Sequence, residues 1–354
     1  MDFNKLHKRN LLTYQAGIDN AFLTFIKEVA VIAVKYKQTE TLFNFSSNKK
    51  LYDKFNKSLS AYENALKVTV TSGIKKEWEF ANKKNDALRD DTLKGLKGKL
   101  SKEQFEAVSS VRSPRNMDAL EAFQKRKKGK YKVSDRVWKI TENARTEMQF
   151  AVDLSLSNGM SAQELNKRLR KQLKDPSAMF RRVRDKHGNL VVSKAMKNYH
   201  SGRGVYKSAH ANARRFIVNE INVAYKEADV LRMKQNPDIV GYEVYLSPSH
   251  KVYDMCDDLK GKYPKSFLFN GWHVQCMCGV RAILKTEAEM LREIKAGVVG
   301  SPKKSENYVG DVPDNFKEWV EDNREKMRNW KTKPSFIEDN YRYGKIVHGL
   351  KPMQ

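Results

Sequence analysis

Cysteine and histidine gather in one short stretch of this chain. All three cysteines of the 354 residues fall between positions 256 and 278, and His250 and His273 lie in or next to the same stretch. Thiolate and imidazole are ligands that zinc prefers, and structural zinc is usually held by four protein ligands in a tetrahedron. We therefore predict one structural zinc site with three sulfur atoms and one nitrogen. The predicted ligands are Cys256, His273, Cys276 and Cys278, and the alternates are His250, Asp254 and Asp257.

Other uses of these thiols stay open at the level of sequence. A single residue separates Cys276 from Cys278, which leaves less room for both sulfur atoms to reach one ion than the usual two-residue gap. The thiols could instead be inert packing groups around Trp272. Alternatively, Cys256 could form a disulfide with either of the other two. His273 and Cys276 could also form a catalytic pair, although nucleophile and base usually meet through the fold and not through adjacency in sequence.

Residues typical of strands flank the cysteines on both sides. The stretch 238–250, DIVGYEVYLSPSH, precedes them, and the stretch 280–286, VRAILKT, follows them. We therefore predict that the cysteines lie at the mouth of a small sheet. Upstream, a helix over 206–234 carries small and apolar side chains along one face and leaves polar residues for other contacts. These polar residues are Arg214, Arg215, Glu220, Asn222 and Lys226.

Helical periodicity dominates the N-terminal part of the chain. Apolar residues recur at steps of three and four from 11 to 36, which predicts a helix with one buried face. They are Ile18, Phe22, Phe25, Val29, Ile32 and Tyr36. Polar stretches at 44–50 and 81–91 are typical of turns or exposed helix ends.

Two helix starts and a hairpin are predicted in the middle of the chain. Ser134 is placed to cap a helix, with Val133 and Trp138 as a hydrophobic staple across its start. Ser161 and Glu164 have the spacing of a capping box, followed by Leu165, Leu169 and Leu173 on one face. The stretch 179–195 reads as a β-hairpin with its turn at Gly188 and a solvated His187.

Together these patterns predict a mainly α-helical α+β chain in which long helices accompany a small β module with the Cys/His cluster. A further helix is predicted to begin near Asp314, with Phe316, Trp319, Val320, Met327 and Trp330 on its apolar face. The predicted regions are an N-terminal helical region at 1–122, a central helical unit with a small hairpin at 123–235, the β module at 236–290, and a C-terminal helix with a basic arm at 291–354.

The composition is strongly basic. The chain has 68 Lys and Arg against 42 Asp and Glu, a formal charge of +26, a pI near 9.8 and a mean hydropathy of −0.71. One interpretation of this excess is an anionic partner such as nucleic acid. The other is that the charge only maintains solubility. A basic run could touch phosphate or act as a solvated linker. It consists of Lys125, Arg126, Lys127, Lys128, Lys130 and Lys132.

Neither a signal-peptide layout nor a membrane-spanning run is recognisable. The most apolar stretch, at 21–36, is interrupted by Lys27 and Glu28. An odd number of cysteines also argues against the disulfide scaffold of a small secreted protein. We therefore expect a protein made in the cytoplasm, without a membrane partner.

The order of three segments resembles the phage Mu protein F-like family, the minor head proteins of tailed bacteriophages. Over roughly residues 120–290, a helix with an Arg…Glu pattern precedes an acidic-Cys segment, a glycine and a closing His-Pro-x-Cys-x-Cys. Two departures from the family pattern are Val274 in place of proline and Tyr253 in place of an additional cysteine, so that His250 is expected to supply a ligand. The matching positions are Arg214 or Arg215 with Glu220, the segment Asp254-Met255-Cys256-Asp257, Gly261, and His273 with Cys276 and Cys278.

This resemblance implies a structural virion component that acts in head morphogenesis. Its partners would be the phage portal protein, scaffold or major capsid protein, and packaged double-stranded DNA. It would be made in the bacterial host cytoplasm, assembled into the phage head near the portal, and would turn over no small-molecule substrate. The sequence agrees with a protein that is not an enzyme, because it contains no H-E-x-x-H, no phosphate-binding loop and no serine nucleophile elbow.

Two alternatives belong to other classes. A metal-dependent nuclease that uses the His/Cys module would explain the charge and the histidines together. Against it, those histidines are needed as ligands, and no carboxylate cluster for a second ion is evident in the sequence. A DNA-binding structural protein with no role in a capsid is the other alternative.

Overall fold

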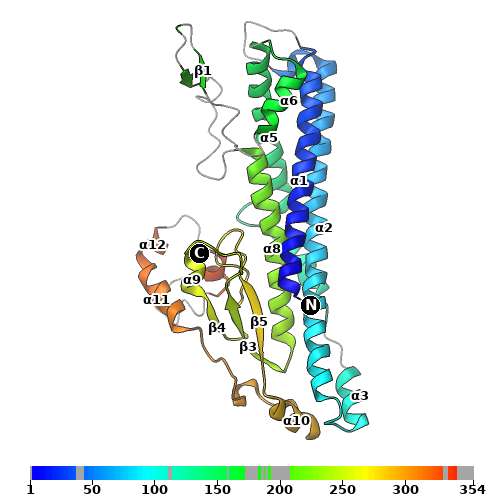
Figure 1. The fold of residues 1–354 in the computed structure, drawn as a ribbon, viewed down its shortest axis with the longest axis vertical. Coiled ribbons are helices and arrows are strands. Elements are labelled where there is room, and N and C mark those ends of the chain that lie inside the picture. Colours follow the sequence, from blue (N-terminus) through cyan, green and yellow to red (C-terminus); the bar gives the residue numbers. More distant parts are fainter. Residues whose placement is uncertain are drawn as a thin grey trace. The chain divides into compact units, whose positions relative to one another are not determined.

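The protein is described by a computed structural model, which confirms a mainly helical α+β fold with a small antiparallel sheet (Figure 1). The described residues are 2–36, 44–110, 114–157, 159–171, 182–184, 187, 190–192, 208–329 and 334–340. Residues 341–354 of the predicted basic arm lie outside them.

Four long helices account for most of the regular structure, namely α1 (Phe3–Ala33), α2 (Lys49–Leu96), α5 (Val133–Ser157) and α8 (Ala209–Gln235). The shorter helices are η1 (Phe45–Ser47), α3 (Lys102–Ser110), α4 (Met117–Lys125), α6 (Ala162–Arg170), α9 (Met255–Leu259), α10 (Glu287–Lys295), η5 (Pro302–Lys304), α11 (Asp314–Asp322), α12 (Arg324–Arg328) and α13 (Ser335–Glu338). The strands are β1 (Arg182–Arg184), β2 (Leu190–Val192), β3 (Ile239–Tyr245), β4 (Gly261–Tyr263) and β5 (Gly279–Leu284).

The chain divides into two compact units, each built from separate segments. We call Met1–Arg9, Ile74–Phe123 and Ile221–Gln354 the cysteine unit, and Asn10–Gly73 and Gln124–Glu220 the bundle unit. Helices α1, α2 and α8 each contribute residues to both units, whereas the sequence-based division used four contiguous ranges. One break, between Phe123 and Gln124, lies one residue from the boundary predicted at 122/123.

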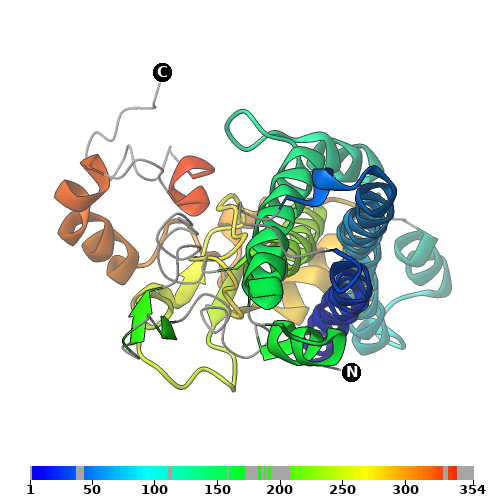
Figure 2. The ribbon, with the colours of Figure 1, turned by 90° about the horizontal axis from the view of Figure 1, so that it is seen from above.

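In the bundle unit, the long helices run side by side (Figures 1 and 2). The apolar stripe predicted on the first helix is buried, including Ile18, Phe22 and Phe25. The Phe25 ring stacks on Tyr62 of α2 with ring centroids 5.2 Å apart. The stripe is therefore buried, as the periodicity predicted, and Phe25 packs on α2, although the helix begins at Phe3 and not near residue 11.

The polar stretch 81–91 is not a turn, and that prediction is wrong. It lies within α2, in the part that belongs to the cysteine unit. The Lys84 ammonium pairs with the Asp229 carboxylate of α8 at 2.5 Å, and the Asn85 amide donates to the same carboxylate at 2.7 Å. Because these polar groups are satisfied by another helix, they interrupt the apolar pattern without ending α2.

The predicted start of α5 is also wrong in detail. The helix already includes Val133, and the Lys132 amide donates to the Asp135 carboxylate at 2.9 Å, so Ser134 is not its cap. Trp138 is 54% exposed and forms no staple. A carboxylate in the first turn accepts an amide proton and also interacts favourably with the positive end of the helix dipole. Asp135, and not Ser134, therefore stabilises the start of α5.

Other local predictions are confirmed. Ser161 and Glu164 form a reciprocal capping box at the start of α6, and Leu165 and Leu169 are buried, while Leu173 lies outside the described residues. Strands β1 and β2 pair as an antiparallel hairpin, and His187 is exposed in its turn.

The cysteine unit contains a three-stranded antiparallel sheet in the order β4-β3-β5. Tyr242 on β3 lies opposite Tyr263 on β4 and Ala282 on β5. Next to a register shift in β3, a Cβ on Gly241 would lie 2.6 Å from the Val309 side chain, so this close approach requires glycine. The strands predicted before and after the cysteines are confirmed as β3 and β5.

An aromatic core holds the sheet, the cysteine loops and the C-terminal helices together. The predicted last helix begins at Asp314 but breaks at Asn323 into α11 and α12. Trp330, predicted on its apolar face, lies outside the described residues. The core includes Tyr242, Tyr263, Phe267, Phe269, Trp272, Cys256, Cys276, Cys278, Phe316, Val320, Met327 and Phe336.

No helix in the described part of the chain combines the length and the hydropathy needed to cross a bilayer.

Candidate metal centre

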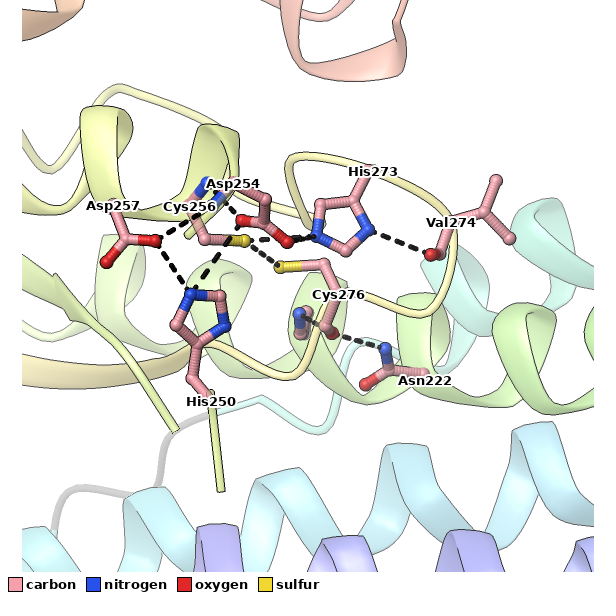
Figure 3. A network of polar contacts seen from close by, with 9 residues as sticks. Asn222, His250, Asp254, Cys256, Asp257, His273, Val274 and Cys276 are labelled. Atoms are coloured by element: carbon pink, nitrogen blue, oxygen red, sulfur yellow. Dashed lines mark hydrogen bonds and ion pairs between the residues drawn. The ribbon is translucent and has the colours of Figure 1, made fainter. Parts of the chain in front are cut away.

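The three cysteines approach one another from two segments of the cysteine unit. Figure 3 shows two of them, Cys256 and Cys276. Cys256 lies in the first turn of α9, after β3, and Cys276 and Cys278 lie in the loop that leads into β5. Their sulfur atoms all lie within 4.8 Å of one another, and Cys256 Sγ is 3.8 Å from Cys276 Sγ. The thiols are free, with 2%, 1% and 5% of the three residues exposed. This buried group could hold a metal ion.

The expectation that a one-residue gap hinders convergence is wrong. Residues i and i+2 of an extended segment project to the same side, and Cys276 and Cys278 lie just before the start of β5 at Gly279. The turn before them is tight, because Gln275 has a φ of 63° and the Cys276 amide donates to the His273 carbonyl at 3.1 Å. The loop thus directs both sulfur atoms toward Cys256.

His273 adds a nitrogen next to the sulfur group. Its Nε2 lies 3.1 Å from Cys256 Sγ, and its Nδ1 is 2.9 Å from the Val274 carbonyl oxygen. Because a carbonyl only accepts, Nδ1 carries a proton, which leaves Nε2 as the ring nitrogen that faces the cluster. The catalytic pair considered from sequence was His273 with Cys276, but the thiol that meets His273 is that of Cys256.

A second group of ligand-type side chains lies beside the first (Figure 3). His250 Nε2 is 2.7 Å from Asp257 Oδ2. The Asp254 carboxylate lies between the two imidazoles, with Oδ2 3.4 Å from His273 Nε2 and Oδ1 4.0 Å from His250 Nε2. From the sequence, all three were only alternate ligands for the zinc site, and no carboxylate cluster for a second ion was evident. The turn before α9 brings them together as a separate group.

Two of these carboxylates also have a local structural role. Asp254 and Asp257 form a reciprocal capping box at the start of α9. The Asp254 carboxylate accepts from the Asp257 backbone amide, and the Asp257 carboxylate accepts from the Asp254 backbone amide. The backbone amide of Asp254 and then the His250 side chain hold the pKa of Asp257 below its ordinary value. The capping box fixes the first turn of α9 and therefore the position of Cys256.

Hydrogen bonding within the sulfur group separates the pKa values of the thiols. Hydrogen bonds with Cys256 and Cys278, followed by the charge of Lys226, lower the pKa of Cys276. Hydrogen bonds with Cys276 and Cys278 raise the pKa of Cys256. The neighbouring sulfur atoms and Lys226 thus stabilise the ionised form of the Cys276 thiol, and the thiolate is the form that binds metals.

The loop that carries Cys276 is tied to α8. The Asn222 amide and the Lys226 ammonium donate to the Cys276 carbonyl at 2.8 and 2.6 Å. Both residues are buried, with 2% and 3% exposed. Gly271 has a φ of 113°, and a Cβ there would lie 3.2 Å from Cys276 Cβ and 3.4 Å from Lys226 Nζ. The sequence assigned Asn222 and Lys226 only to unspecified polar contacts.

A buried histidine of the first helix continues this network and was missed from sequence. His7 Nε2 lies 3.1 Å from Asn222 Oδ1, and His7 Nδ1 lies 2.5 Å from Glu77 Oε2. Since the Asn222 nitrogen donates to Cys276, its oxygen must accept, so His7 Nε2 carries a proton. No local pattern identifies His7, whose partners are 70 and 215 residues away.

The polar residues of the Arg…Glu pattern on α8 belong to the bundle unit, whereas the three cysteines belong to the cysteine unit. Glu220 pairs with Arg126 at 2.7 Å and with Arg136 at 3.3 Å. Arg214 pairs with Asp19 of α1 at 3.3 Å, and Arg215 is half-buried. These side chains link α8 to other segments of the bundle.

The predicted phosphate-contacting run forms a tight turn between α4 and α5. Gly129 has a φ of 63°, and Lys128 and Tyr131 form an isolated bridge around it. Arg126 is engaged by Glu220 and is therefore not directed to solvent like the lysines around it. The exposed members of the run are Lys125, Lys127, Lys128, Lys130 and Lys132. Contact of this run with nucleic acid stays a prediction.

Comparison with known proteins identified no matching family model, no matching curated protein and no matching solved structure.

Proposed function

We propose that this chain is a structural minor head protein of a tailed phage, and that its cysteine unit contains one zinc ion that rigidifies the site. The observation that carries the proposal is the packing of the motif segments. The closing Cys-x-Cys loop meets the acidic-Cys helix α9 at Cys276, where Asn222 and Lys226 of α8 also bind the loop. The Arg214 and Glu220 positions of the pattern belong to the bundle unit instead. Function resides in specific sites and not in the fold as a whole, so the meeting of pattern residues at one site is the observation that supports the proposal.

The proposed zinc ligands are Cys256, Cys276, Cys278 and His273. A tetrahedron with zinc–sulfur bonds of about 2.3 Å has sulfur–sulfur edges of about 3.8 Å, and the Cys256–Cys276 separation is 3.8 Å. His273 already presents Nε2 to Cys256. Bound zinc would join α9 to the loop before β5, although Cys256 and Cys276 are 20 residues apart in the chain.

Burial of the sulfur atoms favours a structural role for this site. Structural zinc sites are closed by protein ligands, whereas catalytic sites keep one position open to water or substrate. The three cysteines are nearly inaccessible, and two buried side chains of α8 fix the backbone beneath them. The proposed partners are portal, scaffold or major capsid protein, with packaged DNA as a further contact for the basic surface, and the proposed location is the phage head.

A nuclease is the second candidate, and the His250, Asp254 and Asp257 group favours it. These three side chains are partly exposed and lie next to the sulfur group, where a hard cation and a histidine could act on a phosphodiester. The same two carboxylates cap α9, which accounts for their arrangement without a cation.

Three measurements on the full-length protein separate these functions. For a minor head protein we expect about one zinc per chain by elemental analysis, co-sedimentation with purified portal protein, and intact plasmid after incubation with Mg²⁺. Phage particles produced without this gene product should be defective in composition or infectivity. Plasmid cleavage that is lost in the His250→Ala variant would establish the nuclease instead. Normal particles in the deletion would overturn the head role.

A further inference from the structure

A lysine-lined groove lies between α1 and α2 in the bundle unit. Its volume is about 620 Å³. Lys27 and Lys35 of α1 line one side, and Lys54 and Lys57 of α2 line the other. Glu28 is the only carboxylate among the described residues that line it. Four lysines and one glutamate give the groove a formal charge of +3, from four minus one.

The groove also has apolar lining residues. Val31 and Ile32 of α1 and Ala61 of α2 line it together with the lysines, Thr24 and Ser58. Residues 27, 31 and 35 are four apart and therefore share one face of α1. Val31 is 50% exposed and so presents apolar surface to whatever lies in the groove. Exposed Val31 and Ala61 thus share the groove with lysines of both helices.

The lysines of the groove lack acidic partners within the part of the chain that the structure describes. None of Lys27, Lys35, Lys54 and Lys57 forms an ion pair there, and all four are exposed. By contrast, Lys67 further along α2 pairs with Glu63 at 2.5 Å. Four like charges around one concavity repel one another, and an anionic ligand would relieve that repulsion.

We propose that this groove binds an acidic amphipathic helix of a partner protein. Lys27 and Lys35 are about 12 Å apart along α1, the length of two turns of a partner helix. Apolar side chains on one face of that helix would contact Val31 and Ala61, and glutamate or aspartate beside them would meet the lysines. The inference goes beyond the proposed head role, since the groove belongs to the bundle unit and involves none of the proposed zinc ligands.

The exposed Val31 side chain favours a helix over nucleic acid. Phosphate contacts would use the lysines but would gain nothing from Val31, which would then be covered by a charged backbone. A helix with one apolar and one acidic face uses both features. Sensitivity to Val31 therefore distinguishes the two ligands.

The test measures fluorescence anisotropy with the full-length protein and three labelled probes. The first probe is a synthetic helix of about 18 residues with leucines on one face and glutamates beside them. The second has the same composition in scrambled order, and the third is a DNA duplex of similar net charge. We expect the amphipathic helix to bind at least about tenfold more tightly than the scrambled peptide.

Matched variants locate the binding site. The double variant Lys27→Glu/Lys57→Glu should weaken binding of the amphipathic helix by at least about tenfold, and Val31→Ser by about threefold. Lys27→Arg/Lys57→Arg should retain it. Lys75→Glu/Lys76→Glu, which changes two exposed lysines of α2 outside the groove, makes the same change in net charge and should leave specific binding in place.

Three results would overturn the proposal. The first is no binding of the amphipathic helix at about 100 µM. The second is equal loss of binding in the groove variant and the Lys75/Lys76 control. The third is a groove variant that loses affinity for the duplex while Val31→Ser changes nothing, which would assign the groove to nucleic acid. None of these results depends on zinc or on particle assembly, so the proposed head role is tested separately.

Discussion

The Asn222 side chain donates a hydrogen bond of 2.8 Å to the backbone carbonyl of Cys276, 54 residues further along the chain. The oxygen of the same amide faces His7, and His7 in turn faces the carboxylate of Glu77. Residues of α1, α2 and α8 within the cysteine unit thus determine where one loop places its sulfur atom. The cysteine site depends on its helices as much as on its own loops.

Replacing Asn222 with alanine should destabilise the protein by about 1–3 kcal/mol. The change removes a donor from the Cys276 carbonyl and leaves the Nε2 proton of His7 without its acceptor in a buried place. Urea unfolding followed by circular dichroism measures the loss. Asn64→Ala, at an exposed position of α2, serves as the control and should change the free energy of unfolding by less than about 0.5 kcal/mol. Equal stability of both variants would show that the network contributes nothing.

Replacing Cys276 with serine should abolish zinc binding and lower the free energy of unfolding by about 3 kcal/mol or more. The thiol at this position is the one whose neighbours stabilise its ionised form, and a serine hydroxyl does not replace it as a ligand. Elemental analysis and thermal unfolding measure both effects. Met277→Leu, between the two cysteines, controls for local packing. Unchanged stability together with a wild-type protein free of zinc would reject the metal hypothesis.

Replacing Gly271 with alanine should cost about 1–3 kcal/mol. Its φ of 113° is unfavourable for any residue with a side chain, and the added Cβ would press on Cys276 and Lys226. The variant should also bind zinc more weakly, because the loop must shift. Gly17→Ala is the contrasting control, since a Cβ at this helical position meets nothing within 4 Å and should stabilise α1 by about 0.5–1 kcal/mol.

Buried His210 should make the protein sensitive to mild acid. Burial, and then the charge of Arg214, lower the pKa of His210 from 6.5 to about 3. Between these values the unfolded chain binds a proton that the folded chain does not, so stability falls as the pH decreases below 6.5. At pH 5 the loss attributable to His210 is about 2 kcal/mol. Burial raises the pKa of the neighbouring Asp19, which acts in the opposite direction and offsets part of this loss.

The His210→Phe variant tests this dependence. The new ring can keep the stacking that His210 makes on Phe22, at a centroid distance of 4.5 Å, but it does not titrate. Unfolding free energies measured from pH 7 to pH 5 should therefore decline less steeply in the variant than in the wild type. Parallel curves for the two proteins would contradict the assigned role of His210.

Several features of this fold could be predicted because they depend on neighbours in sequence. The stripe on α1 follows from the 3.6-residue period, the capping box of α6 depends on Ser161 and Glu164 alone, and β3 and β5 follow from strand-forming residues. Gathering of cysteine and histidine within 29 residues, from His250 to Cys278, likewise indicated a ligand cluster before any distance was known.

Other features follow from partners far away in the chain. The polar stretch of α2 resembles a turn until Asp229 is brought against Lys84 and Asn85, and the start of α5 depends on which side chain reaches the Lys132 amide. A local pattern cannot reveal whether a polar group will be satisfied by another segment, which decides whether a helix continues.

Periodicity, composition and spacing are properties of the chain alone, and they specify its helical character, its positive charge and the residue types available for a metal site. The convergence of three sulfur atoms, the approach of His273 to Cys256 and the support of the Cys276 loop by His7 and Asn222 arise from packing. These relationships depend on contacts between residues up to 215 positions apart, whose geometry is determined when the helices and the sheet pack and bury their polar groups.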